Sequence, residues 1–302
     1  MPKKLLFVFN ARAGKSHISD NLCEIINVFT AGGYEVTAYP TQCRLDAFQK
    51  IKDRAGDFDM IVASGGDGTL SEAIKGLMNS RAKPLIGYIP AGTVNDFARS
   101  MDIPRNMVQA AQNVLNGTPF ALDIGSFNGE FYSYVAAFGA FTDVSYETPQ
   151  STKNLLGHLA YFLEGIKRIN KLEAYDITVE HDGEVIRDDF VAGLITNSRT
   201  IGGLKNLVAN GVIFDDGKFE VTLVKMPNSP LELQGLLAKI VMGDLNSKYF
   251  VTFKTSNLRV TCDSEIAWTL DGESGGSYTV AEIQNHKRAL NIIIPREDKS
   301  DV

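Results

Sequence analysis

Two glycine-rich loops with embedded carboxylates are the part of this sequence best suited to chemistry. Gly65-Gly66-Asp67-Gly68-Thr69 follows the apolar run Phe58–Ala63, and Gly92-Thr93-Val94-Asn95-Asp96 follows the apolar run Leu85–Ile89. Glycines let backbone N–H groups approach a phosphate closely, and a helix that begins behind the loop adds donors and a favourable dipole. A carboxylate in such a loop repels phosphate unless Mg²⁺ mediates or the carboxylate orders neighbouring donors. We therefore expect both loops to bind phosphate, with tight turns and helix caps as the alternative.

The elements that must position these loops alternate through the first third of the chain. Strands are predicted at Leu5–Asn10, Tyr34–Tyr39, Phe58–Ala63 and Leu85–Ile89, and helices at Asp20–Ala31, at Leu45–Arg54, from Thr69 through Met78 and from Asn95. This alternation is typical of a doubly wound parallel sheet with helices on both faces. Ligands bind at the carboxyl ends of such strands, where both glycine loops begin.

Strand patterns dominate after about residue 122. Strands are predicted at Phe131–Phe138, Tyr175–His181, Glu184–Asn197, Phe219–Val224, Phe250–Phe253, Leu258–Thr261, Ile266–Leu270, Tyr278–Val280 and Ala289–Ile294, with helices at Leu155–Lys171 and Pro230–Met242. Turns such as Asp182-Gly183 and Asp216-Gly217 separate several strands, as hairpins require. We therefore predict a mostly antiparallel β-sandwich, or a barrel, over residues 123–289. The α/β domain covers residues 1–122, to which the segment 290–302 could also contribute.

The composition is typical of a globular protein and argues against two classes. The chain has 302 residues, a net charge of −6 and no visible basic stripe, so a nucleic-acid partner is not expected. No run approaches the ~18 apolar residues of a membrane span. The three cysteines and four histidines show neither a disulfide framework nor metal-ligand spacing. We expect a cytoplasmic protein whose membrane contact is peripheral.

Three motifs together make the chain resemble the diacylglycerol kinase catalytic-domain family, and most closely its soluble bacterial diacylglycerol and lipid kinases. They are Gly65–Thr69, Gly92–Ala98 and Asp271-Gly272-Glu273, and the likeness covers nearly the whole chain in order and spacing. NAD kinases share the first motif, but the other two favour the lipid kinases. The resemblance implies transfer of the γ-phosphate of ATP to the hydroxyl of diacylglycerol, giving phosphatidic acid. It also implies that the α/β domain holds ATP and that the β-sandwich helps to bind the lipid.

The resemblance implies roles for individual residues. Glu273 would be the general base that accepts the proton of the lipid hydroxyl. Asp67, Asp96 and Asp123 would form a carboxylate network near the Mg²⁺ of the nucleotide. The residues implied to contact ATP are Asn10, Ala11, Arg12, Ala13, Gly14, Thr41, Gly65, Gly66, Asp67, Gly68, Thr69, Leu70, Ser71 and Thr93.

The segment Asn10–Gly14 corresponds to the Asn-Pro-x-x-Gly nucleotide loop of the family, with Ala11 in place of proline. It runs into Gly14-Lys15-Ser16, which is also how a P-loop ends. A P-loop requires glycine at position 9, where this chain has Phe9. We therefore expect an ATP contact here without a P-loop, and no Mg²⁺ ligation by Ser16.

The triplet Asp-Gly-Glu occurs twice. Asp182-Gly183-Glu184 lies between two alternating runs, and we interpret it as an ordinary hairpin turn. Asp271-Gly272-Glu273 matches the late position of the family motif and takes the catalytic role, with a hairpin turn as its alternative.

A structural Mg²⁺ site is also implied by the resemblance. Its ligands would be the side chain of Asp216 and the backbone carbonyls of Ile213 and Lys218. Hard oxygen ligands suit Mg²⁺, although Asp215-Asp216-Gly217 is equally typical of a plain turn.

Basic side chains are the candidates for contact with anionic lipid headgroups at the membrane surface: Lys15, Arg99 and Lys167. Their alternative is solvated surface charge, because most lysines and arginines are exposed. No motif identifies the lipid, and the sequence leaves both a monomer and a homodimer open.

Three other functions remain open from the sequence. The first is a kinase of another lipid, such as phosphatidylglycerol or a sphingoid base, and the second is an NAD kinase-like enzyme. The third is a non-catalytic regulator that binds nucleotide or lipid. The presence of Asp67, Asp96 and Glu273 disfavours this last function, because a pure binder needs no base.

Overall fold

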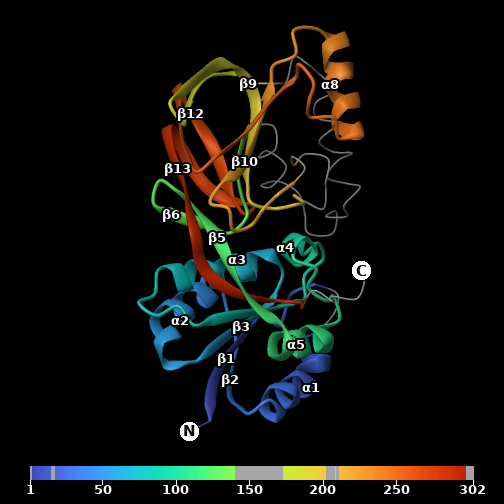
Figure 1. Cartoon of the computed structure of the whole chain (residues 1–302), viewed down its shortest axis with the longest axis vertical. Helices are drawn as coiled ribbons and strands as arrows, with labels where there is room; N and C mark the ends of the chain where they lie inside the picture. The colour runs from blue at the N-terminus through green and yellow to red at the C-terminus, as the bar shows by residue number, and fades with distance from the viewer. Residues whose placement is uncertain (1, 15–17, 140–172, 202–207, 209–210, 297–302) are drawn as a thin grey trace. The chain divides into compact units, whose positions relative to one another are not determined.

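The computed structural model describes residues 2–14, 18–139, 173–201, 208 and 211–296 (Figure 1). The chain divides into two compact units, which we call unit 1 (Met1–Leu122 with Arg288–Val302) and unit 2 (Asp123–Lys287). Two strands, β5 (Thr118–Phe127) and β13 (Glu273–Ile294), contribute residues to both units. The helix expected at Leu155–Lys171 lies outside the described residues.

Unit 1 is built on a parallel sheet in the order β13-β4-β3-β1-β2. Its strands are β1 (Lys3–Phe9), β2 (Tyr34–Pro40), β3 (Met60–Gly65) and β4 (Leu85–Pro90), and its helices are α1 (Ile18–Ala31), α2 (Asp46–Arg54), α3 (Asp67–Met78), α4 (Asp96–Ser100) and α5 (Met107–Asn116), with a 3₁₀ turn, η1, at Ala55–Asp57. Helices α1 and α5 pack together, as do α2 and α3, and the two pairs lie on either side of the strands (Figure 1). The predicted doubly wound α/β class is confirmed.

The strand ends of unit 1 are level with one another. In the parallel ladders Phe9 is opposite both Pro40 and Ser64, and Gly65 is opposite Pro90. Every residue of β3 is buried, because helices cover both faces of a central parallel strand. The connections that follow β1, β2, β3 and β4 therefore all begin at one edge of the sheet.

Helix α5 was not predicted from the sequence pattern, although its N-terminal cap is well formed. The Asn106 side chain accepts hydrogen bonds from the backbone N–H groups of Val108 (3.1 Å) and Gln109 (3.0 Å). We expect Asn106→Ala to lower the free energy of unfolding by about 1 kcal/mol, because two donors lose their acceptor. Urea denaturation measures this, with Asn116→Ala at the other end of α5 as a control. A loss equal to that of the control would contradict the cap.

Unit 2 is a mostly antiparallel β structure, as predicted. Its further strands are β6 (Glu130–Tyr132), β7 (Val135–Gly139), β8 (Tyr175–His181), β9 (Glu184–Thr196), β10 (Phe219–Lys225), β11 (Phe250–Thr255) and β12 (Asn257–Leu270). The order β11-β10-β9-β7-β12-β13 forms the main path, and β8 pairs with both β9 and β12. The core centres on the buried Trp268, whose ring lies 4.8 Å from that of Phe127 and 4.9 Å from that of Phe138.

Helix α8 (Pro230–Met242) has the predicted bounds. It begins after Ser229, whose hydroxyl accepts a hydrogen bond from the N–H of Glu232, and proline occupies its first turn. Leu233, Leu236 and Ile240 are buried in a second hydrophobic cluster, which includes residues of β7, β9, β10 and β11.

Several predicted strands of unit 2 have different bounds. Leu258–Thr261 and Ile266–Leu270 belong to one strand, β12, and Tyr278–Val280 and Ala289–Ile294 both belong to β13. The β12–β13 pairing shifts register between Thr261 and Ile266. The polar residues in such an irregular stretch break the alternation of the sequence without ending the strand. The strand β5 was not predicted.

The strand predicted at Phe131–Phe138 is wrong as a single element. Strand β6 ends at Tyr132 and β7 begins at Val135. The backbone N–H groups of Ser133 and Tyr134 bind the side chain of Asp271 instead of a neighbouring strand. A partner 138 residues away in the sequence therefore breaks the strand.

Candidate functional site

The predicted nucleotide-binding segments of unit 1 gather at the level edge of the parallel sheet. The N–H of Asn10 donates to the carbonyl of Ser64 (2.9 Å), the N–H of Thr41 to that of Phe9 (2.9 Å), and the N–H of Ala91 to that of Gly65 (2.8 Å). These bonds connect segments that are far apart in the sequence. The edge of the sheet thus carries one continuous group of loops.

The glycines of these loops allow backbone to pack against backbone. A Cβ atom on Gly92 would lie 2.5 Å from the Cα of Gly66, and one on Gly14 would lie 2.1 Å from the carbonyl oxygen of Ala91. Gly14 also has a φ of +65°, which side chains with a Cβ rarely adopt. The geometry fits a phosphate cradle, in which N–H groups rather than side chains face the ligand.

Asn95 closes the second glycine loop on itself. Its Oδ1 accepts a hydrogen bond from the N–H of Gly92 (3.0 Å), and its Nδ2 donates to the carbonyl of Gly92 (2.8 Å). Asn95 precedes α4 but makes no side-chain cap bond to it, and its φ is +54°. The alternative that Asn95 is a plain helix cap is therefore wrong.

Asp67 joins the two glycine loops. It is the first residue of α3, yet its Oδ1 accepts a hydrogen bond from the N–H of Phe97 (3.2 Å) in the first turn of α4. The carboxylate therefore orders donors of the neighbouring loop, which is one of the two functions expected for it. Asp96 begins α4 and is buried, so two of the three carboxylates of the predicted network belong to this region of unit 1, whereas Asp123 belongs to unit 2.

Tyr88 supports the same region and was missed by the sequence reasoning. Its hydroxyl is fully buried and donates to the carbonyl of Gly65 (3.0 Å). Burial, with a smaller contribution from the negative charge of Asp67, raises the pKa of Tyr88 well above its ordinary value, so the hydroxyl stays a donor. An aromatic hydroxyl in the aliphatic strand Leu85–Pro90, just before a polar loop, was the available signal.

Asn10, rather than a proline, restrains the loop after β1. The Oδ1 of Asn10 accepts a hydrogen bond from the N–H of Arg12 (2.9 Å), and its carbonyl accepts one from Ala13 (3.1 Å). This Asx turn restrains the segment that a proline at position 11 would otherwise restrain. Lys15 and Ser16 lie outside the described residues.

The remaining predicted nucleotide residues differ in what they can offer a ligand. Ala11, Arg12, Gly68 and Thr93 are exposed, and Thr41 and Thr69 are half-buried. Leu70 and Ser71 are buried in α3, and the N–H of Leu70 donates to the carbonyl of Gly66. The exposed residues of the loops are therefore better placed to meet a phosphate than the buried residues of α3.

In unit 2, Asp123 fastens the loop that contains the predicted Mg²⁺ site. Its Oδ2 accepts a hydrogen bond from the N–H of Gly217 (2.6 Å), and its N–H donates to the carbonyl of Phe214 (2.9 Å). Oδ1 of Asp216 accepts from the N–H of Lys218 (2.9 Å), as in a plain turn. Within the described ranges, no three His, Cys, Asp or Glu side chains are grouped so that they could hold a metal ion.

An ion pair with a buried carboxylate lies beside this loop. Glu220 is 1% exposed, and the Nζ of Lys254 lies 2.8 Å from its Oε1 and 2.9 Å from the carbonyl of Gly211. Burial raises the pKa of Glu220, and Lys254 opposes that shift. The pair ties β10 and β11 to the start of the loop.

The backbone does not distinguish the two Asp-Gly-Glu triplets. Asp182 and Gly183 have φ values of +47° and +83°, and Asp271 and Gly272 have values of +53° and +83°. Both pairs form the two-residue turn of a β-hairpin, with Glu184 opposite His181 and Glu273 opposite Leu270. Both glutamates are exposed.

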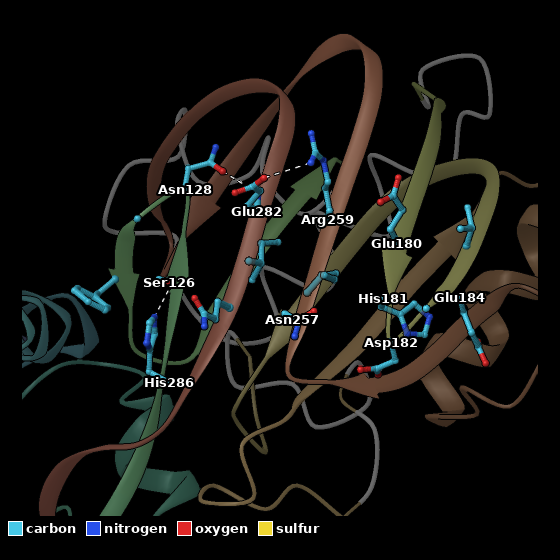
Figure 2. A pocket seen from close by; sticks show the side chains of 17 residues that line it. Ser126, Asn128, Glu180, His181, Asp182, Glu184, Asn257, Arg259, Glu282 and His286 are labelled. Carbon is cyan, nitrogen blue, oxygen red and sulfur yellow. Dashed lines mark hydrogen bonds and ion pairs between the residues drawn. The ribbon is translucent and has the colours of Figure 1, made fainter.

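A pocket of about 730 Å³ in unit 2 includes the first triplet but not the second (Figure 2). Its labelled side chains come from the β5–β6 hairpin, the β8–β9 hairpin, β12 and β13. Among them, Arg259 pairs with Glu282 at 3.5 Å, and a His286 ring nitrogen lies 2.8 Å from Ser126 Oγ. Among the residues that the structure describes, none of those predicted to bind nucleotide, metal or headgroup lines this pocket.

The predicted headgroup residues are mostly outside the described part of the chain, as Lys15 and Lys167 both are. Arg99 lies in α4 and is half-buried, and its Nε has no hydrogen-bond partner among the described residues. No helix in the described ranges combines the length and apolarity needed to cross a bilayer.

Two family models together match most of the chain. Residues 4–127 match the diacylglycerol kinase catalytic domain, and residues 136–294 match the YegS C-terminal NAD kinase beta sandwich-like domain. A Bacillus subtilis protein named diacylglycerol kinase is 31% identical over 297 residues, which cover 98% of this chain and 97% of that protein. A Staphylococcus aureus protein of the same name is 29% identical, with 98% and 94% covered.

Solved structures from Bacillus anthracis agree with the fold. One has a TM-score of 0.85 at 25% identity and covers 97% of this chain and 95% of its own. Another, of a diacylglycerol kinase, has a TM-score of 0.76 at 22% identity, covers 97% of both chains and shows similarity of fold alone.

Proposed function

Because the chain belongs to the diacylglycerol kinase catalytic-domain family, we propose that it transfers the γ-phosphoryl group of ATP to the free hydroxyl of diacylglycerol and forms phosphatidic acid. The observation that carries this proposal is the interlocked pair of glycine loops in unit 1, where Asp67 binds the backbone of the neighbouring loop. Phosphoryl transfer depends mainly on positioning and charge neutralisation, which loops fastened to each other by hydrogen bonds support.

The nucleotide would be held by the loops that follow β1, β3 and β4. Their backbone N–H groups would bind the phosphate oxygens, and the N-terminus of α3 would add its favourable dipole. Mg²⁺, when bound, neutralises charge on the phosphates, and Asp67 and Asp96 are the carboxylates of unit 1 that would hold it. Asp123 of unit 2 remains a predicted member of this network.

The acceptor hydroxyl must lose a proton as it attacks phosphorus. Glu273 is the proposed general base: its side chain is exposed beyond the β12–β13 turn, and a carboxylate within hydrogen-bond reach can accept that proton. The backbone carbonyls of Ile213 and Lys218, with Asp216, remain the proposed structural Mg²⁺ ligands. Peripheral contact with the lipid surface through basic residues is part of the proposal.

The test is transfer of label from γ-labelled ATP, with Mg²⁺, to lipids in mixed micelles or to NAD in solution. We expect label in phosphatidic acid when diacylglycerol is the acceptor, and little label with phosphatidylglycerol or sphingosine. Preferred labelling of another lipid would change the acceptor, and labelling of NAD would favour an NAD kinase-like enzyme. No transfer to any of them would overturn the proposal.

A further inference from the structure

The carboxylate of Asp271 is buried and surrounded by donors from one short segment. Only 6% of the residue is exposed. Its Oδ2 accepts hydrogen bonds from the N–H and the hydroxyl of Ser133, both at 2.7 Å, and its Oδ1 accepts from the N–H groups of Tyr134 (2.9 Å) and Val135 (3.2 Å). Three successive N–H groups around an anion form a strong, directional site.

The same segment also binds the backbone of Asp271. The N–H of Asp271 donates to the carbonyl of Val135 at 2.8 Å. The β6–β7 connection therefore gives up strand pairing at Ser133 and Tyr134 in order to hold this one residue. The charge of Asp271 also affects Tyr132. Burial is the main cause that raises the pKa of Tyr132 well above its ordinary value, and the negative charge of Asp271 adds to it.

The corresponding aspartate of the other triplet has no such setting. The side chain of Asp182 is 51% exposed, and its Oδ2 lies 3.7 Å from Nδ1 of His181. Figure 2 shows Asp182 and Glu184 beside His181 at the pocket. The two hairpins share the triplet Asp-Gly-Glu, the turn type and an exposed glutamate, and they differ in whether the aspartate is anchored.

We propose that Asp271 is a positioning residue that fixes the hairpin carrying Glu273, through its bonds to residues 133–135. This inference rests on the proposed function, in which Glu273 is the base. Glu273 is the first residue of β13 and directly follows the Asp271-Gly272 turn, so the position of its backbone depends on how that turn is held. A base must be held within hydrogen-bond reach of its proton, and a misplacement of about 1 Å can cost about 10²-fold in rate.

The first test is Asp271→Asn, which keeps the size of the side chain and tolerates a positive φ but turns one acceptor into a donor. We expect kcat for diacylglycerol to fall by about 10- to 100-fold, with KM for ATP within about twofold. Amide hydrogen exchange at residues 133–135 and 272–273 should become faster. Ser133→Ala keeps three of the four bonds and should give a smaller fall. An unchanged kcat in Asp271→Asn would overturn the proposal.

A double variant separates positioning from general damage. Asp271→Asn added to Glu273→Gln should cause no further loss of kcat, because Asp271 acts through Glu273. An equal further loss would overturn the proposal. If the double variant is too slow to measure, exchange at residues 272–273 decides: unchanged exchange in Asp271→Asn overturns the proposal.

Asp182→Asn is the matched control, since it makes the same change in the same type of turn. It should leave kcat, KM and the melting temperature unchanged. Absence of lipid phosphorylation by the unaltered protein would instead overturn the proposed function, and exchange at residues 133–135 would still test the anchor.

Discussion

Glu273→Gln is expected to lower kcat for diacylglycerol phosphorylation by about 10²- to 10⁴-fold, the usual contribution of a general base. Glutamine keeps the size of the side chain but cannot accept the proton of the attacking hydroxyl. Affinity for ATP should stay the same, because in the proposed mechanism Glu273 acts on the lipid hydroxyl and the loops of unit 1 hold the nucleotide. Label transfer from ATP measures the rate, and titration with an ATP analogue measures the affinity.

Glu184→Gln is the control for this prediction. Glu184 follows the same Asp-Gly turn, has an exposed side chain and lies in the same unit. Its replacement should leave kcat within about twofold, as expected for a surface substitution away from a site. Full activity in Glu273→Gln would remove the base assignment. Loss of activity in a folded Glu184→Gln variant would transfer that assignment to the first triplet.

The sequence predicted the elements whose signals are local. Strands β1, β3 and β4 contain continuous apolar runs, and β2 alternates. Helix α8 has a serine cap, a first-turn proline and a glycine after its last residue. All of these signals are visible in a short window of sequence. The level strand ends then follow from parallel pairing, which explains why the glycine loops could be expected at one edge of the sheet.

What the sequence pattern could not predict depends on partners far away in the chain. Asp67 reads as a cap of its own helix, but it binds Phe97, thirty residues on. Phe131–Phe138 reads as one strand because its apolar residues alternate, and only the distant Asp271 removes two amides from it. In both cases a buried or half-buried carboxylate binds backbone donors that only the tertiary fold brings near. The hydrophobic periodicity of a segment does not indicate such a distant partner.

The roles of the site residues came from resemblance rather than from pattern. The two Asp-Gly-Glu triplets have the same turn, so their local sequence does not indicate which of them carries the general base. The structure supplies a physical difference, because only Asp271 of the two aspartates is buried against backbone donors. The buried Asp271 bears on how the backbone of Glu273 is held in place. Whether Glu273 acts as the base is tested by the kinetics of the variants.

Gly92→Ala is expected to weaken ATP binding by about 5- to 150-fold. The added Cβ would lie 2.5 Å from the Cα of Gly66 and 2.7 Å from Oδ1 of Asn95. A backbone neighbour cannot rotate away, so the two loops must separate, and such overpacking costs about 1–3 kcal/mol. Titration with a fluorescent ATP analogue measures the affinity, and thermal melting without nucleotide shows whether the variant folds.

Two further variants make this result specific to the cradle. At Gly56 a Cβ would be 3.6 Å from the Cβ of Ala82, an ordinary contact, so Gly56→Ala should bind ATP normally. Asn95→Ala adds no atoms but removes both bonds that close the Gly92 loop, and it should also weaken binding. ATP affinity unchanged in both Gly92→Ala and Asn95→Ala would mean that the phosphates bind elsewhere. Weaker ATP binding in both variants would show that the affinity depends on the conformation of this loop. Gly92→Ala overpacks the loop, and Asn95→Ala removes the hydrogen bonds that close it.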